Sequence, residues 1–156
     1  MRKLLTVLLL LAALPVAGCD SPGDDDDNGI TNAQLEALAD VFSCDVEAIR
    51  LNGDESGSLS TSDCENPADQ SFIDYYGFRL TESTEVDIRL SSDEFDTYLF
   101  LYDEDGNVIE FHDDIDFPDN TNSRITRTLE AGVYAIGANS FDEGETGSYT
   151  LELDEN

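Results

Sequence analysis

The sequence predicts an all-β fold, an antiparallel β-sandwich preceded by one short helix. From Phe72 onward, apolar residues alternate with polar ones in short runs, as in strands with one buried face. The pairs Asp105-Gly106, Ala131-Gly132 and Glu143-Gly144 supply turns between these runs. Alternating runs with a turn every 8 to 12 residues or so are typical of a sandwich.

The chain divides into three parts. Its 156 residues allow one domain of ordinary size. We expect a signal peptide over residues 1–18, an acidic disordered tether over 19–29, and a single β-sandwich domain over 30–156. The tether contains four adjacent aspartates, Asp24 to Asp27, and no large apolar residue, so we expect it to hold the domain off a membrane.

The N-terminus is typical of an export signal. Arg2 and Lys3 precede an apolar run of about 11 residues, which is too short for a membrane span of roughly 20. The following Val16-Ala17-Gly18-Cys19 resembles the bacterial lipobox, which implies that Cys19 is acylated and becomes the mature N-terminus. The expected product is a membrane-anchored lipoprotein that faces the periplasm or the cell exterior. The alternative is a plain signal peptide that is cut beside a cysteine.

The charge excludes one class of partner. The chain has 36 acidic residues against 7 basic ones and a formal charge of −29, so it is not a nucleic-acid binder. Once the signal peptide is removed, the remaining basic residues are five arginines. Two explanations stay open: adaptation to high salt, which screens self-repulsion, or simple solubility of an exposed lipoprotein.

The elements can be placed in order. Apolar residues at helical spacing predict a helix from Asn32 to Phe42, with Thr31 or Asn32 as its cap. Period-two alternation predicts strands over residues 72–80, 85–90, 98–102, 107–111, 124–129, 133–138 and 149–153. Arg127 falls at an inward position of its strand, which predicts either a bulge or an ion pair with a buried acid.

Two cysteines remain once Cys19 carries lipid. Cys44 and Cys64 form an even pair in an exported chain, which predicts a disulfide. It would close a loop of about 21 residues and stabilise the fold by about 3 kcal/mol on the chain-entropy model. Two free thiols are the alternative.

Six segments resemble the bacterial pre-peptidase C-terminal domain family, in the family's order, over about residues 49–153. They are Asp74-Tyr75-Tyr76-Gly77-Phe78-Arg79-Leu80, the run from Asp96 to Asn107 (DTYLFLYDEDGN), Asp113-Asp114, Asn122-Ser123-Arg124-Ile125, Leu129-Glu130-Ala131-Gly132-Val133-Tyr134 and Gly147-Ser148-Tyr149-Thr150-Leu151. The resemblance implies a jelly-roll-like sandwich of eight or nine strands. Members of the family usually accompany exported enzymes, and similar domains in clostridial collagenases bind collagen and calcium.

One acidic cluster is a candidate calcium site. Calcium takes six to eight oxygen ligands, which carboxylates and amides supply. The candidate ligands lie around a predicted hairpin: Asp103, Asp105, Asn107, Asp113, Asp114, Asp116 and Asp119. The spacing is not that of an EF-hand. The alternative is a solvated turn in an acidic protein.

Three aromatic residues are a candidate binding face. If Leu99 and Leu101 face the core, then Tyr98, Phe100 and Tyr102 share the outer face of their strand. Such a row could stack on sugar rings or hold a peptide. The alternative is that a second layer, such as the predicted helix, covers it.

The sequence contains no recognisable catalytic set. Its one histidine, His112, has no nucleophile motif beside it, and neither Ser123 nor Ser140 lies in a G-x-S-x-G elbow. We therefore expect a lipid-anchored, extracytoplasmic and non-catalytic binding module for a protein or glycan partner, for which calcium is the only candidate cofactor. The alternative is a calcium-stabilised structural module of the cell envelope.

Overall fold

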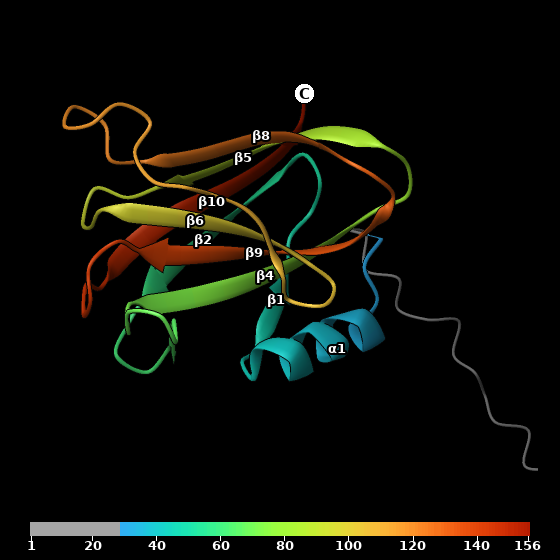
Figure 1. Ribbon diagram of the computed structural model, residues 1–156, viewed down its shortest axis with the longest axis horizontal. Helices are drawn as coiled ribbons and strands as arrows, with labels where there is room; N and C mark the ends of the chain where they lie inside the picture. The colour runs from blue at the N-terminus through green and yellow to red at the C-terminus, as the bar shows by residue number, and fades with distance from the viewer. Residues whose placement is uncertain (1–28) are drawn as a thin grey trace, which may run out of the picture.

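The computed structural model describes residues 29–156, which form one helix and ten strands in two sheets (Figure 1). The elements are α1 (Asn32–Phe42), β1 (Val46–Ala48), β2 (Gly53–Leu59), β3 (Cys64–Glu65), β4 (Phe72–Leu80), β5 (Thr84–Ser91), β6 (Thr97–Asp103), β7 (Val108–His112), β8 (Ser123–Leu129), β9 (Gly132–Ser140) and β10 (Gly147–Glu155). The fold is thus the predicted β-sandwich with one short helix. The predicted signal peptide, Cys19 and nearly all of the predicted tether lie outside the described residues.

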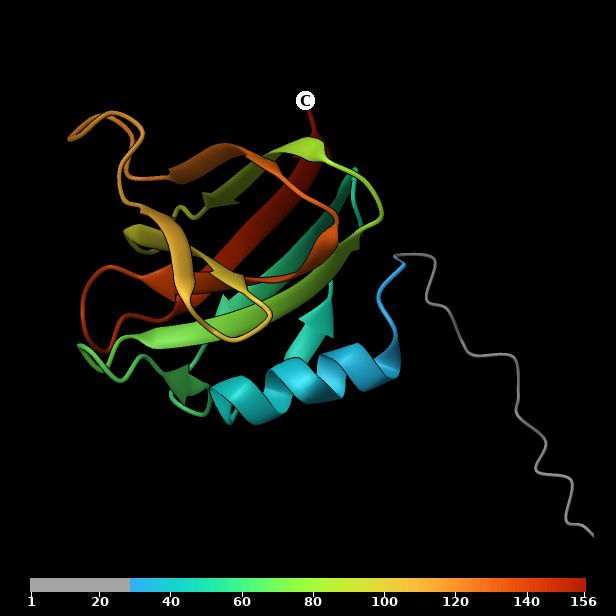
Figure 2. The ribbon, with the colours of Figure 1, turned by 45° about the vertical axis from the view of Figure 1, so that its right-hand side comes forward.

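Within each of the two sheets, almost all neighbouring strands run antiparallel. One has the order β1-β4-β9-β6-β7, with β3 also paired to β4, and the other has the order β2-β10-β5-β8. Only β1 runs parallel to its neighbour, β4. Figure 2 shows the sheets face to face and α1 outside the sandwich. No helix in residues 29–156 is long and apolar enough to cross a membrane.

The helix begins and ends where the sequence predicts. Thr31 is the N-cap: its hydroxyl accepts the Gln34 backbone N–H at 3.3 Å, and the Gln34 side chain accepts the Thr31 backbone N–H at 3.0 Å. This reciprocal capping box satisfies two backbone donors that the first turn leaves without partners. Ser43 ends the helix in the left-handed conformation, with φ at 55°.

Strand β4 is buried on both faces and therefore joins two hydrophobic cores. Tyr76 and Phe78 belong to the core between the sheets, whereas Ile73 and Tyr75 belong to the core beneath α1. Gly77 allows the helix to approach, because a Cβ there would lie 2.8–3.0 Å from helix-side apolar carbons. The alternation in the sequence reveals the face that packs between the sheets. The other face is buried because α1 packs against it.

The segment before β4 contains three strands that the sequence analysis did not predict. Strand β2 alternates between exposed and half-buried residues at an edge of its sheet, and its only large apolar residue is Leu59. It pairs with β10 along its whole length. Gly57 faces the ring of Tyr149, where a Cβ would lie 2.3 Å from ring atoms. These three strands raise the strand number to ten.

Of the two alternatives for Arg127, the bulge is wrong, and the ion pair is present although its acid is not buried. The register between β5 and β8 is continuous, so no bulge is present. Arg127 instead donates to Glu110 of β7 at 2.9 Å, and both side chains are partly exposed. Strand β8 is an edge strand, so a side chain on its inner face reaches solvent at the open side of the sandwich.

The predicted disulfide is confirmed. Cys44 and Cys64 are bonded, with their Cα atoms 6.3 Å apart. The bridge joins the segment after α1 to β3, and so fastens the helix end to the edge of the larger sheet.

Candidate functional site

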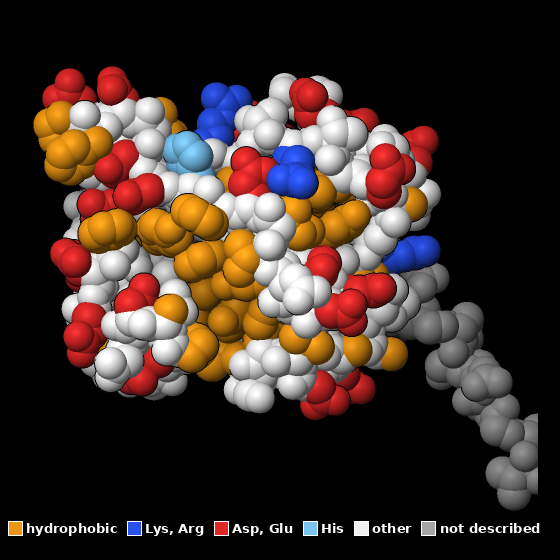
Figure 3. Space-filling model, viewed as in Figure 1, with side chains coloured by type: hydrophobic (Ala, Val, Ile, Leu, Met, Phe, Trp, Pro, Cys, Tyr) orange, Lys and Arg blue, Asp and Glu red, His pale blue; other side chains and the backbone are white. Residues whose placement is uncertain are grey.

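One face of the larger sheet carries a hydrophobic groove, which we call the aromatic groove. Its volume is about 640 Å³. Its floor is the outer face of β6, and its walls come from the end of α1, the segment between β3 and β4, and the start of β7. It is lined by Val41, Phe42, Ser43, Cys64, Glu65, Asn66, Pro67, Ala68, Asp69, Tyr75, Tyr98, Phe100, Tyr102, Gly106 and Val108. Figure 3 shows hydrophobic surface gathered in the middle of this face, with acidic side chains on both sides.

The alternation of β6 places the three predicted aromatics on this floor. Leu99 and Leu101 are fully buried in the core between the sheets, so their neighbours point outward. The helix covers Tyr102, which is 8% exposed and packs edge-on against Phe42 at 5.0 Å. Tyr98 and Phe100 stay partly exposed. The row is thus covered at one end and open at the other.

Two aromatics that the sequence analysis did not include extend the open end. Phe111 of β7 stacks on Tyr98 with ring centroids 5.8 Å apart, and Phe141 lies 6.1 Å from the same ring. They are 58% and 48% exposed. The pairing of Phe111 with Phe100 across β6 and β7 places it there, and that register requires the fold.

The charges around the aromatic groove are negative. Glu65 and Asp69 belong to its wall, and its lining within the described residues includes no lysine, arginine or histidine. Burial, together with the nearby charges of Asp113 and Asp69, raises the pKa of Tyr98 above its usual value. Burial and the neighbouring Tyr75 raise the pKa of Tyr102 as well.

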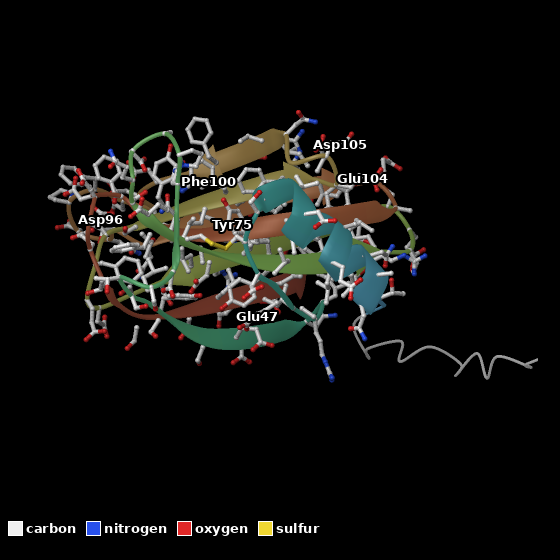
Figure 4. The ribbon with its side chains drawn as sticks, turned by 90° about the horizontal axis from the view of Figure 1, so that it is seen from below. Glu47, Tyr75, Asp96, Phe100, Glu104 and Asp105 are labelled. Carbon is white, nitrogen blue, oxygen red and sulfur yellow. A yellow bond between two sulfur atoms is a disulfide. The ribbon has the colours of Figure 1, made fainter. Side chains whose placement is uncertain are left out.

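The seven candidate calcium ligands do not meet at one place. The hairpin of β6 and β7 puts Asp103, Asp105 and Asn107 at its turn, whereas Asp113 and Asp114 follow its other end. Figure 4 labels Asp105, at the turn, far from Asp96, whose carboxylate lies close to those of Asp113 and Asp114. An extended strand of seven residues spans roughly 20 Å, so the two groups cannot share an ion.

The turn at the first end satisfies its own polar groups. Asp103 accepts hydrogen bonds from the backbone N–H groups of Asp105 at 3.1 Å and Asn107 at 2.8 Å, and from the side-chain amide of Asn107. These bonds hold the pKa of Asp103 below its usual value. The arrangement matches the solvated turn that was the alternative to a metal site.

The other end gathers a different set, which we call the acidic corner: Asp96, Asp113, Asp114 and Glu145. Carboxylate oxygens of the three aspartates lie within 4.8 Å of one another. Each of the four residues has one oxygen that is shielded from solvent and has no hydrogen-bond partner. Asp116 and Asp119 lie in a separate turn, in which the Asp116 carbonyl accepts the Asp119 N–H at 2.8 Å.

The carboxylates of the acidic corner repel one another, and burial further disfavours their charged forms. Burial raises the pKa of Asp96 to about 6, and the charges of Asp114, Asp113 and Glu145 add to the shift. Burial and Asp114 also raise the pKa of Asp113. Sequence analysis did not include Asp96 in the cluster, although Asp96 begins the DTYLFLYDEDGN segment. Only the antiparallel pairing of β6 with β7 brings the start of β6 beside the end of β7.

Within the described residues, no hydrogen bond joins His112 to Ser123 or to Ser140, whose hydroxyl donates to the Asp142 carbonyl at 3.0 Å. His112 contacts the carbonyl of Asp113 through Nδ1 at 3.1 Å. The Ser123 hydroxyl donates to the Thr97 carbonyl at 2.7 Å and is buried with it. A buried hydroxyl that donates to a carbonyl, with no base beside it, is not activated as a nucleophile.

The fold and site define a two-sheet β-sandwich with a surface groove. Residues 72–140 match the family model of the bacterial pre-peptidase C-terminal domain. The predicted resemblance to this family is therefore confirmed over residues 72–140. A search of curated proteins finds no match.

Two solved structures are similar to this chain in fold. The first is the pre-peptidase C-terminal domain of a collagenase from Bacillus anthracis, with a TM-score of 0.54 and 18% identity over 70% of this chain and 95% of that one. The second is PliG from Aeromonas hydrophila, a periplasmic inhibitor of g-type lysozyme, with a TM-score of 0.51 and 10% identity over 71% of this chain and 96% of that one.

Proposed function

We propose that this protein is a lipid-anchored binding module that acts outside the cytoplasm and catalyses no reaction. In this proposal Cys19 carries the lipid, and the aromatic groove holds a protein or glycan partner. The anchor rests on the lipobox-like sequence before Cys19. The binding role rests on the groove, since large exposed aromatic surface is uncommon on a small soluble domain without a partner.

The observation that carries the binding role is the exposure of four aromatic rings in one continuous group. Tyr98 contacts Phe100 at 4.9 Å, Phe111 at 5.8 Å and Phe141 at 6.1 Å. Rings in such a group can stack on sugars or on the side chains of a peptide.

Lipid attachment is tested by labelling cells that produce the full chain with a radioactive or alkyne fatty acid. The chain should incorporate label and appear in the membrane fraction. The Cys19→Ser variant should lose both the label and the membrane association. Equal labelling of both proteins would refute an anchor at Cys19.

Binding is tested with the full chain, extracted in mild detergent, on panels of defined oligosaccharides and peptides. Tyr98→Ala and Phe111→Ala should weaken any specific binding about fivefold or more, because each removes a stacking surface. Phe117→Ala is the matched control, since Phe117 is 71% exposed but does not line the aromatic groove. Binding that survives both variants would refute the groove and the aromatic group at its open end as the site.

A calcium-stabilised structural module is the second candidate. The observation that favours it is the acidic corner, where each of four carboxylates has a shielded oxygen without a hydrogen-bond partner. Oxygen atoms of this kind are the ligands that calcium prefers, and a cation would relieve the repulsion between Asp96, Asp113 and Asp114. In that case Asp96, Asp113 and Asp114 would hold the ion, and its charge would stabilise the ends of β6 and β7.

Thermal unfolding with calcium and with chelator, at matched ionic strength, tests this second candidate. Calcium at micromolar to millimolar concentration should raise the melting temperature. Asp113→Asn should remove that rise, whereas Asp105→Asn, at the other end of the hairpin, should keep it. No rise in the unaltered protein would leave the acidic corner without a metal.

A further inference from the structure

We propose that the aromatic groove takes a cationic polypeptide segment, with arginine or lysine side chains lying over Tyr98 and Phe100 and between the carboxylates of Glu65 and Asp69. This inference rests on the proposed binding role of the same groove. It narrows the partner from a protein or glycan to a basic protein. Three features of the groove carry it.

The first feature is the combination of open aromatic faces with carboxylates. Tyr98 and Phe100 are partly exposed on the floor, and Glu65 and Asp69 are exposed on the wall formed by β3 and the segment that follows it. A cation over an aromatic ring is attracted by the negative face of the ring, and a nearby carboxylate adds a direct charge contact. An aromatic face and a carboxylate both repel an anion.

The second feature is that the acidic wall is held in position. The Asp69 carboxylate accepts the Ser71 backbone N–H at 3.1 Å and also the Ser71 hydroxyl. Ser71 is fully buried and hydrogen-bonded to Asn139 on β9. A carboxylate fixed in this way loses less side-chain freedom when it meets a partner.

The third feature is the lack of competing positive charge. No lysine, arginine or histidine of the described residues lines the groove. Several arginines are engaged elsewhere: Arg89 and Arg124 with Asp87, and Arg127 with Glu110.

The neutral amide in the groove is already occupied. Asn66 is 8% exposed, and its side chain accepts the Ala68 backbone N–H at 3.1 Å and contacts Asn139. The chain's charge of −29 also draws basic proteins toward this surface.

The test uses the full chain in mild detergent and three soluble probes of defined chemistry. They are a peptide that alternates arginine and glycine, the same peptide with citrulline in place of arginine, and a chitin hexasaccharide. Binding is followed by calorimetry and by tyrosine fluorescence, since the chain contains no tryptophan. The arginine peptide should bind, and the citrulline peptide, which is nearly equal in shape but neutral, should bind at least about tenfold more weakly.

Paired variants separate the groove from general attraction to an acidic protein. The double variant Glu65→Gln with Asp69→Asn should bind the arginine peptide about fivefold or more weakly, and so should Tyr98→Ala. The control pair Asp54→Asn with Glu82→Gln removes the same charge at exposed positions outside the groove and should change binding by less than about twofold.

Each other outcome overturns the inference. Equal losses in the test and control pairs would mean that only net charge attracts the peptide. Citrulline binding as tight as arginine binding, or binding of the hexasaccharide alone, would mean that the groove prefers a neutral ligand, which keeps the proposed binding role. No binding of the arginine peptide at millimolar concentration would refute a cationic partner.

Discussion

The ionised Asp96 side chain is predicted to destabilise the folded protein at neutral pH when no cation is bound. Its pKa is raised from 3.8 to about 6 by burial and by the acidic neighbours Asp114 and Asp113. One unit of pKa shift corresponds to about 1.4 kcal/mol, so the full shift would be worth about 3 kcal/mol. Because the side chain is partly exposed, solvent screening reduces the expected cost to about 1–2 kcal/mol.

The sign of the pH dependence follows from the direction of the shift. The folded state holds the Asp96 proton more tightly than the unfolded state does, so folding is favoured while the proton is bound. The contribution is greatest below about pH 4, near the unfolded pKa, and is lost as the pH rises through about 6. Above that range the charge is a constant cost.

The assay is urea unfolding of the full chain and of Asp96→Asn, with chelator, at pH 4 and at pH 7.5. Ionic strength is fixed, and urea is used because guanidinium salts would screen so acidic a chain. The variant should be about 1–2 kcal/mol more stable at pH 7.5 and nearly equal at pH 4. Asp105→Asn, which lies in an exposed turn, is the control and should change stability by less than about 0.5 kcal/mol at both values.

Two results would refute the reasoning. One is an Asp96→Asn variant that is less stable than the unaltered protein at pH 7.5 in chelator, which would mean that the carboxylate has a stabilising partner. The other is a stability difference that does not change between pH 4 and pH 7.5. If calcium binds the acidic corner, its addition should reverse the order of stability, because only the unaltered protein keeps all its ligands.

Three further predictions concern the disulfide, the packing under α1 and the ion pairs, and each is tested by urea unfolding. Removing the Cys44–Cys64 bridge with serines should cost about 3 kcal/mol, mainly by freeing the unfolded chain; a loss below about 1 kcal/mol would contradict this. Gly77→Ala should cost about 1–3 kcal/mol, because the new Cβ meets the apolar side chains beneath α1, and unchanged stability would show that the helix can shift. Arg124→Ala should cost about 1–3 kcal/mol, since it binds a carboxylate that is only 3% exposed, whereas Arg127→Ala, in an exposed pair, should cost less than about 1 kcal/mol. Equal costs for the two arginines would contradict that ranking.

Local patterns were enough to predict most elements of the fold. The spacing of Leu35, Leu38 and Phe42 gave the bounds of α1, because an amphipathic helix needs no distant partner to show its period. The strands from β4 onward, apart from the mostly exposed β7, were visible because each buries one face against the same core. Edge strand β2 was not visible, since its residues are mostly small or polar and only β10 specifies its pairing.

The candidate sites show a similar division. The outward direction of Tyr98 and Phe100 follows from alternation within β6, which the sequence contains. Their exposure does not, because it depends on where α1 ends: the helix reaches Tyr102 and stops short of the other two rings.

The sequence by itself therefore determined the fold class, the helix, the disulfide and the acidic character of this protein, because these depend on local period, residue type and charge. Only the tertiary structure decided which residues meet. It separated Asp103 from Asp113 by the length of a hairpin and brought Asp96 to the latter. The physical reason is that strand pairing joins residues far apart in the chain, and a one-dimensional pattern contains no information about which ends of paired strands coincide.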